Sequence, residues 1–209
     1  KFDDGTQVYT AKSPNLKLLS ESWLTEGLVR KWFSSKRDTC YCATNGMSSI
    51  AKSLGIGLPI RTSQKVIEIQ RHKNYWLTYI ESGEIYRSKQ LISTAPYPQT
   101  RALLSTSLLD ELQQQYPSLT KISYQPCFAV MVLTDASSHI QNPNEIPRDN
   151  PYIDWIADNA QKVNESDYSA LTIHTTPSFT NEHLETDKEQ ILALILNSAQ
   201  QWIKGTIIE

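Results

Sequence analysis

The sequence contains few cysteines, and their number and spacing limit the chemistry available to them. Three cysteines among 209 residues leave at least one thiol unpaired, so they cannot make a complete disulfide framework. Cys40 and Cys42 fall two residues apart on an expected strand, where their Cα atoms would lie about 6.5 to 7 Å apart, which is long for a disulfide. We therefore expect three free thiols and a cytoplasmic protein.

The sequence also lacks long apolar runs, basic clusters and metal-binding motifs. No stretch approaches the roughly 18 consecutive apolar residues of a membrane helix, and the first residues do not follow a signal-peptide pattern. The charges nearly balance, with 20 basic and 22 acidic residues and no basic run, so nucleic acid and anionic membranes are not expected partners. The four histidines do not occur in a metal-ligand spacing, and we predict no metal site.

The stretch from Gly46 to Pro96 is the most regular part of the sequence. Apolar residues recur at helical spacing from Met47 to Leu54, and Gly55 is placed to end that helix in a left-handed conformation. Three extended segments follow it, and polar turns separate them: Pro59–Gln70, Tyr75–Ile80 and Gln90–Pro96.

Helices and strands are also expected on both sides of this stretch. Capping and apolar spacing predict helices over Ser13–Leu28, Leu108–Tyr116 and Asp187–Lys204, the last with a capping box of Thr186 and Glu189. Strands are expected over Val29–Trp32, Thr39–Ala43 and Cys127–Leu133. The segment Asp135–Asn150 is rich in Ser, Asn and Pro and is predicted to be a loop.

Two further strands carry side chains suited to facing a ligand. In Pro151–Asn159, strand alternation places Ile153, Trp155, Ala157 and Asn159 on one face. In Ala170–Thr176, it places Thr172, His174 and Thr176 opposite Leu171 and Ile173. His174 is therefore expected on a polar face.

Several short motifs, taken in order, resemble those of the flavin-containing amine oxidases and, more narrowly, the renalase-like FAD-dependent oxidoreductases. The resemblance spans nearly the whole chain. It rests on Asp3-Asp4-Gly5-Thr6-Gln7-Val8-Tyr9, on Asn45-Gly46-Met47-Ser48-Ser49, on the strand that ends Thr94-Ala95-Pro96, on Tyr124-Gln125-Pro126-Cys127, on Trp155-Ile156-Ala157-Asp158-Asn159 and on Ile173-His174-Thr175-Thr176.

The resemblance implies an α/β (α+β) fold with two parts. A partial FAD-binding, Rossmann-like domain would comprise residues 1–10 and 45–95, and a substrate-binding domain with a mixed β-sheet and flanking helices would comprise 11–44 and 96–209. A flavoprotein of this kind holds the pyrophosphate at a Gly-x-Gly-x-x-Gly turn, which this sequence lacks. We therefore interpret the chain as the central fragment of a longer protein, without the glycine-rich unit or a C-terminal flavin-binding segment.

The same resemblance implies roles for individual residues. Contacts with the FAD cofactor would come from Gln7, Met47, Val66, Thr94, Ala95 and Pro96. Catalytic roles would fall to His174 and Asn159, and Trp155, Lys162 and Thr172 would bind substrate. Each assignment has a structural alternative: a strand histidine is often a satisfied structural group, Trp155 suits a core position, and we favour an exposed loop for Lys162.

Two classes of function remain open from the sequence. The first is part of a renalase-like FAD-dependent oxidoreductase that acts on a small molecule, either a reduced nicotinamide dinucleotide or an amine. The flavin would carry out the electron transfer and the protein would position its partners. The second is a binding or interaction module without catalytic activity. In either case we expect this chain alone to retain no FAD, because it lacks the glycine-rich turn.

Overall fold

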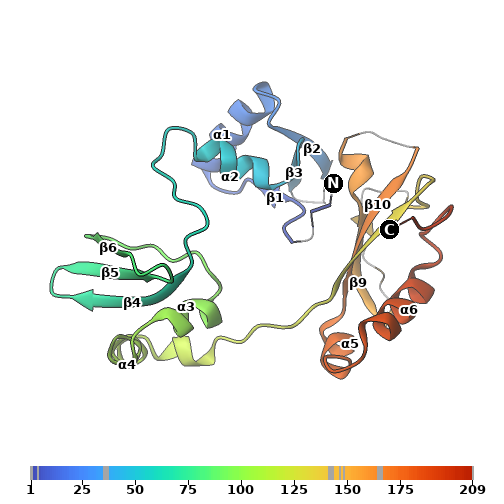
Figure 1. Cartoon of the computed structure of the whole chain (residues 1–209). Helices are drawn as coiled ribbons and strands as arrows, with labels where there is room; N and C mark the ends of the chain where they lie inside the picture. The colour runs from blue at the N-terminus through green and yellow to red at the C-terminus, as the bar shows by residue number, and fades with distance from the viewer. Residues whose placement is uncertain are drawn as a thin grey trace. The chain divides into compact units, whose positions relative to one another are not determined.

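A computed structural model describes residues 2–3, 5–34, 38–140, 144–145, 147, 149–163 and 167–208. The chain forms two compact units, one made of Lys1–Gly57 with Gln125–Glu209 and the other of Leu58–Tyr124 (Figure 1). None of the helices in the described ranges is long and apolar enough to cross a membrane.

The first unit begins with a small antiparallel sheet and two helices. The sheet has the strand order β1-β3-β2. Its elements are β1 (Tyr9–Thr10), α1 (Pro14–Thr25), β2 (Val29–Ser34), β3 (Thr39–Ala43) and α2 (Ser48–Leu54). The Ser13 side chain accepts a hydrogen bond from the Leu16 N–H, so the predicted cap of α1 is confirmed.

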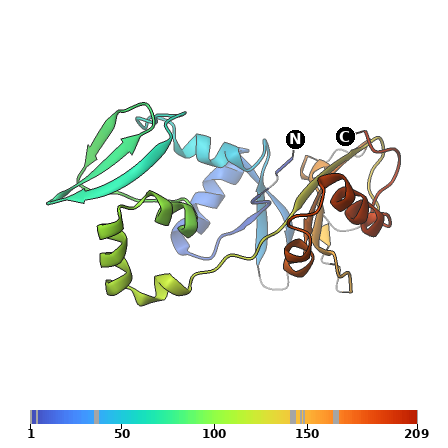
Figure 2. The same ribbon diagram turned by 60° about the horizontal axis from the view of Figure 1, so that its bottom comes forward.

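The same unit contains a second antiparallel sheet with the strand order β7-β10-β9-β8. Its elements are β7 (Ala129–Thr134), β8 (Asn144–Glu145), β9 (Ile153–Asp158), the 3₁₀ helix η2 (Asn159–Lys162), β10 (Ser169–Thr175), α5 (Pro177–Glu182) and α6 (Lys188–Ala199). Both α5 and α6 lie on one face of this sheet (Figures 1 and 2). Ile156 and Ile173 pack there with Ile191 and Ile195 in the main core.

The second unit is a three-stranded antiparallel sheet with three short helices. The strand order is β4-β5-β6. Its elements are β4 (Val66–His72), β5 (Tyr75–Ile80), β6 (Ile85–Ser88), α3 (Tyr97–Leu103), α4 (Thr106–Gln115) and the 3₁₀ helix η1 (Pro117–Lys121). Arg71 of β4 and Glu111 of α4 form an exposed ion pair at 2.6 Å, which connects α4 to the sheet.

The expectation of a mixed sheet was wrong, because every strand pair between named strands in the described residues is antiparallel. Short hairpin connections explain this in the second unit, since parallel strands need long crossovers. The predicted strand Gln90–Pro96 was also wrong. That segment is irregular, and Ile92 is 87% exposed, because no neighbouring strand pairs with it among the described residues.

The end of α2 and both ends of the last helix differ from the sequence prediction. Gly55 is right-handed with φ −79°, and Gly57 takes the left-handed conformation with φ +79° instead. The last helix is capped by Asp187, whose side chain accepts from the Glu189 N–H, and not by Thr186. It ends at Ala199 instead of continuing to Lys204.

Strand alternation failed at one position of β9. The register of β9 against β10 shifts between Trp155, opposite His174, and Ile153, opposite Thr175. This irregularity reverses the side-chain direction, so Ile153 joins Ile156 in the main core. Trp155 and Ala157 instead pack with Trp32 and Cys42.

Part of the predicted loop Asp135–Asn150 lies outside the described residues. In the described part, Ile140 is buried in the main core and the His139 N–H donates to the Trp202 carbonyl. Residues Asn144 and Glu145 form β8 and pair with β9. The described part of this segment is therefore packed against the second sheet.

The two compact units do not coincide with the division proposed from the sequence, which separates residues by the ligand they would bind. The units break the chain near Gly57 and Gln125. The assignment of 1–10 and 45–95 to FAD, and of 11–44 and 96–209 to substrate, remains a prediction about binding.

All three cysteines are free thiols, and they differ in exposure. Cys40 and Cys42 are buried and Cys127 is exposed. Burial raises the pKa of each thiol above its ordinary value, which lowers the reactive thiolate fraction. We expect a thiol reagent at neutral pH to modify Cys127 in the folded protein, and all three cysteines after unfolding without reductant. Rapid reaction of Cys42 in the folded chain would contradict its burial.

Candidate functional site

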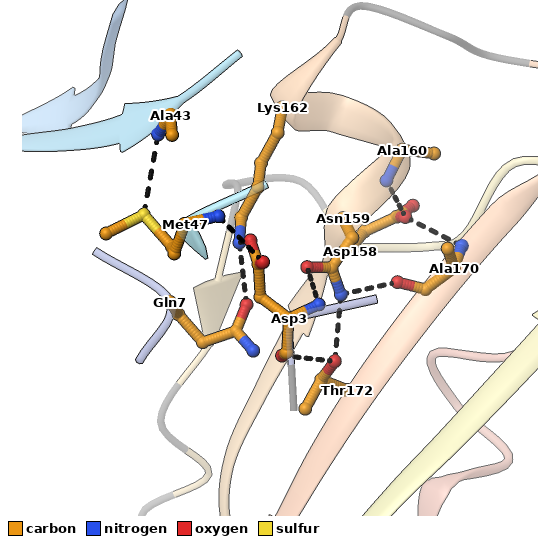
Figure 3. Close-up of polar contacts among 10 residues, drawn as sticks. All are labelled: Asp3, Gln7, Ala43, Met47, Asp158, Asn159, Ala160, Lys162, Ala170 and Thr172. Carbon is orange, nitrogen blue, oxygen red and sulfur yellow. Dashed lines mark hydrogen bonds and ion pairs between the residues drawn. The ribbon is translucent and has the colours of Figure 1, made fainter. Parts of the chain in front are cut away.

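A buried lysine lies at the centre of the candidate site. Lys162, at the end of η2, is only 4% exposed, so the sequence interpretation as an exposed loop residue was wrong. Its Nζ donates to Asp3 Oδ2 and to Gln7 Oε1, both at 2.8 Å (Figure 3). It also lies 4.7 Å from the centre of the Trp32 ring, a cation–π distance. Two hydrogen-bond acceptors and an aromatic ring therefore surround the ammonium group.

Asp3 connects this lysine to three other parts of the first unit. Its second carboxylate oxygen accepts from the Met47 N–H at 2.9 Å, at the start of α2. Its backbone N–H donates to Asn159 Oδ1 at 3.4 Å, and its carbonyl accepts from Thr172 Oγ1 at 3.3 Å (Figure 3). These bonds fix the N-terminal segment against η2 and β10.

Asp158 fixes the turn that directs Lys162 inward. Its carboxylate is 2% exposed and accepts from the backbone N–H groups of Ala160 and Ala170 at 3.0 Å each. It also accepts from Ser138 Oγ at 2.7 Å. A carboxylate with three donors serves both as the cap of η2 and as a link to β10. Sequence reasoning identified neither Asp3 nor Asp158.

Burial changes the proton affinity of this cluster. Desolvation lowers the pKa of Lys162 below the ordinary lysine value, while the hydrogen bond and charge of Asp3 act in the opposite direction. Desolvation also raises the pKa of the nearby Cys42 thiol, an effect that Lys162 partly offsets. Asp3 is therefore the group that makes a lysine ammonium tolerable at this depth.

The cluster has more hydrogen-bond donors than acceptors. Lysine can only donate, so Gln7 must turn its amide oxygen toward Lys162 and its NH₂ group elsewhere. In the described part of the chain, neither Gln7 Nε2 nor Trp32 Nε1 has a partner, although both are buried. Each such donor costs about 1 to 3 kcal/mol. A group with acceptor atoms, rather than another donor, would suit this region.

An open groove of about 570 Å³ borders the cluster. The rings of Trp155 and His174 lie side by side in it, with centres 5.2 Å apart and an angle of 35° between their planes. Its lining consists of Gly5, Thr6, Gln7, Val8, Phe33, Asp154, Trp155 and His174. The lining is largely aromatic and apolar, with one carboxylate.

A smaller cavity of about 240 Å³ lies at the other end of the cluster, with Asp3, Asn159 and Lys162 in its lining. Asn159 is buried, and its amide nitrogen donates to the Ala170 carbonyl and to Thr172 Oγ1. Its polar atoms are thus already used within the protein. Lys162 links the two spaces, because it contacts Asp3 in the cavity lining and Gln7 in the groove lining.

The structure brings together only some of the residues proposed from the sequence. Gln7, Trp155 and His174 share the groove, while Asn159 and Lys162 line the cavity. Thr172 is fully buried behind Asp3. These roles in binding and catalysis remain predictions.

Met47 and the second-unit residues occupy other environments. The Met47 sulfur accepts from the Ala43 N–H at 3.4 Å, and its side chain packs beside Trp32 and Cys42. Val66 is half-buried in β4, and Thr94, Ala95 and Pro96 are exposed in an irregular segment of the second unit. Their proposed contacts with the cofactor remain predictions. No group of three or more potential metal ligands occurs in the ranges that the structure covers.

Three solved structures share part of this fold. A putrescine oxidase bound to putrescine matches with a TM-score of 0.58 at 15% identity, over 79% of this chain and 36% of that enzyme. A reduced UDP-galactopyranose mutase matches with 0.58 at 13% identity, over 93% and 44%. A Pyrococcus furiosus protein matches with 0.58 at 14% identity, over 82% and 43%. The chain therefore has part of an FAD-dependent oxidase fold and spans less than half the length of these three proteins.

The family follows from the sequence match. Residues 12–208 match the flavin containing amine oxidoreductase family, and the chain belongs to that family. The resemblance noted from the short motifs is confirmed at this level. The family uses FAD.

Proposed function

We propose that this chain forms the substrate side of a flavin-dependent oxidoreductase of the renalase-like type, with the groove as its substrate pocket. The proposal is supported by family membership and by the groove lining, in which Trp155 and His174 form one wall and Gly5–Val8 another. The first wall would orient the substrate and the second would lie against the flavin ring. The bound flavin would accept the electrons.

The groove residues suit a flavin ring better than they suit a dinucleotide phosphate. Gln7 has a buried amide N–H₂ without a partner in the described structure, and a flavin ring carries acceptor atoms of the matching kind. The α2 N-terminus is a poor phosphate site, because the Met47 N–H already donates to Asp3. This chain therefore supplies contacts for the ring and not for the pyrophosphate.

The negative charge of the groove favours an amine over a dinucleotide as the substrate. Our choice between these two substrates is based on this observation. Asp154 is an exposed carboxylate in the lining, whereas Lys162 is buried and paired with Asp3. Among the described lining residues of the groove there is no lysine or arginine to meet a pyrophosphate. A carboxylate attracts an ammonium group and repels a phosphate.

A reduced nicotinamide dinucleotide is the second candidate substrate. The neighbouring Trp155 and His174 rings offer a surface on which a flat nicotinamide ring can stack. In either case His174 would hydrogen-bond to the substrate, and Asn159 would act by holding Asp3 and Thr172 in place. The non-catalytic binding module is distinguished from both by the absence of electron transfer to added flavin.

Binding of amines tests the proposal. We expect benzylamine to bind in the groove and to shift the NMR signal of the Trp155 indole, with Asp154→Asn weakening the affinity about tenfold, since a charge-assisted contact contributes about 1.5 kcal/mol. Glu185→Gln, a change at an exposed carboxylate outside the groove, is the matched control and should leave the affinity unchanged. Tighter binding of NADH than of benzylamine, strengthened further by Asp154→Asn, would favour the dinucleotide.

A further inference from the structure

The outer face of β7 carries apolar side chains where polar ones are expected. Val130 and Val132 point into the main core, so strand alternation places Ala129, Met131 and Leu133 on the other face. We call these three residues the β7 shelf. Ala129 is exposed, Met131 is 45% exposed and Leu133 is half-buried.

The β7 shelf is continuous with the groove through the register of the second sheet. Ala129 lies directly opposite His174 on β10, and His174 lies directly opposite Trp155 on β9. Met131 is opposite Thr172 in the next row. Directly opposed residues of antiparallel strands project from the same face, with Cβ atoms about 4.5 to 5.5 Å apart. The shelf therefore extends the wall formed by Trp155 and His174.

The two ends of this surface differ in charge. Asp154 is next to Trp155 on β9, on one side of β10, and the shelf is on the other side. Strands in a sheet are about 4.8 Å apart, so β9 and β7 are separated by about 10 Å. When one face of an antiparallel sheet meets water, that face usually carries polar side chains. The β7 shelf carries none. The surface thus matches a molecule with a positive head and an apolar tail.

We propose that the β7 shelf is the subsite for the hydrocarbon tail of an amine whose ammonium group lies at Asp154. The inference rests on the proposed function and adds to it a preference for monoamines with an apolar tail over diamines. The ammonium pairs with the carboxylate, the middle of the molecule covers His174, and the tail removes Ala129 and Met131 from water. A second charge at the tail end would have to lose its hydration over Met131.

The preference is measured with three probes on the same chain: octylamine, butylamine and the diamine of the same length as octylamine. Each buried methylene strengthens binding by up to about fourfold, so octylamine should bind at least tenfold more tightly than butylamine. The dissociation constant of the diamine at the same site should be at least tenfold higher than that of octylamine. Isothermal titration calorimetry gives the three dissociation constants.

Substitution of the shelf separates its contribution from that of Asp154. Met131→Glu should weaken octylamine binding about tenfold, leave butylamine unchanged and strengthen binding of the diamine, whose second ammonium meets the new carboxylate. Met131→Ala keeps the shelf apolar but smaller and should lower octylamine affinity less. Leu192→Glu on α6, at a residue 42% exposed, is the matched control and should change none of the three.

The outcomes distinguish the two proposals. If Asp154→Asn weakens both amines but octylamine binds no more tightly than butylamine, the shelf inference fails and the amine site stands. If no amine binds, both fail. Light scattering shows whether Met131→Glu changes the oligomeric state. If it does and the octylamine affinity is unchanged, the shelf is a contact between copies of the chain and the inference is overturned.

Discussion

Replacing Lys162 with methionine should lower the free energy of unfolding by about 3 to 5 kcal/mol, the cost of removing one partner from a buried ion pair. Methionine keeps much of the length and apolar stem of lysine, so the loss reflects the missing charge rather than a cavity. Asp3 is buried, and its carboxylate would lose the ammonium group while keeping the hydrogen bond from the Met47 N–H. Gln7 would lose its partner at the same time.

A double substitution shows whether the charge is the cause. Asp3→Asn combined with Lys162→Met removes both charges and should recover a large part of the lost stability, because no buried charge is left alone. Lys17→Met, at an exposed position of α1 in the same unit, should change stability by less than about 0.5 kcal/mol. Urea unfolding followed by tryptophan emission measures all three variants. A loss below about 1 kcal/mol for Lys162→Met would show that the pair is solvated.

The environment of Lys162 also shows why sequence reasoning failed at this position. Its partner Asp3 is 159 residues away in the chain, and no local pattern indicates such a contact. A lysine after a strand and a short polar turn is normally exposed. Asp3 and Asp158 were overlooked for the same reason, since an isolated carboxylate is usually solvated and only the folded backbone supplies its donors.

Local signals predicted local structure well. The Ser13 cap with Pro14 depends on neighbouring residues alone, and α1 begins where those residues place it. Strand alternation correctly placed His174 away from Leu171 and Ile173, which lie in the main core. It failed at Ile153, because a register shift between two strands is a property of the pair and not of either sequence.

Apolar composition alone was not enough to define a strand. The segment Gln90–Pro96 has the residues of a buried strand, yet it is irregular and its Ile92 is exposed. A strand requires a partner for its backbone groups, which a single-sequence pattern does not supply. The pairing of Trp155 with His174 likewise depends on a partner strand. The sequence indicated each residue separately, and the register of β9 with β10 brings the two rings together in the groove.

Two features of the chain bear on how a flavin would be held. The sequence has seven glycines and no Gly-x-Gly-x-x-Gly turn, the element that lets a backbone approach a pyrophosphate closely. At α2, the N–H of Met47 is directed to the Asp3 carboxylate, which also places a negative charge where a phosphate would have to approach. Burying a pyrophosphate without such donors is unfavourable. Ring contacts at Gly5–Val8 and the groove would then supply the binding that this chain offers.

We therefore expect the purified chain to be colourless, without a stoichiometric flavin absorption band, and to bind lumiflavin and FAD with dissociation constants within about threefold of each other. Lumiflavin has the ring system without the ribityl diphosphate and adenosine, so equal affinity means that those groups add no net binding. Titration with quenching of flavin fluorescence gives both constants, and Trp155→Leu should weaken both to the same extent, since Trp155 lines the groove. FAD binding a hundredfold more tightly than lumiflavin, or a yellow preparation with stoichiometric flavin, would place a phosphate site among residues that have been assigned structural roles.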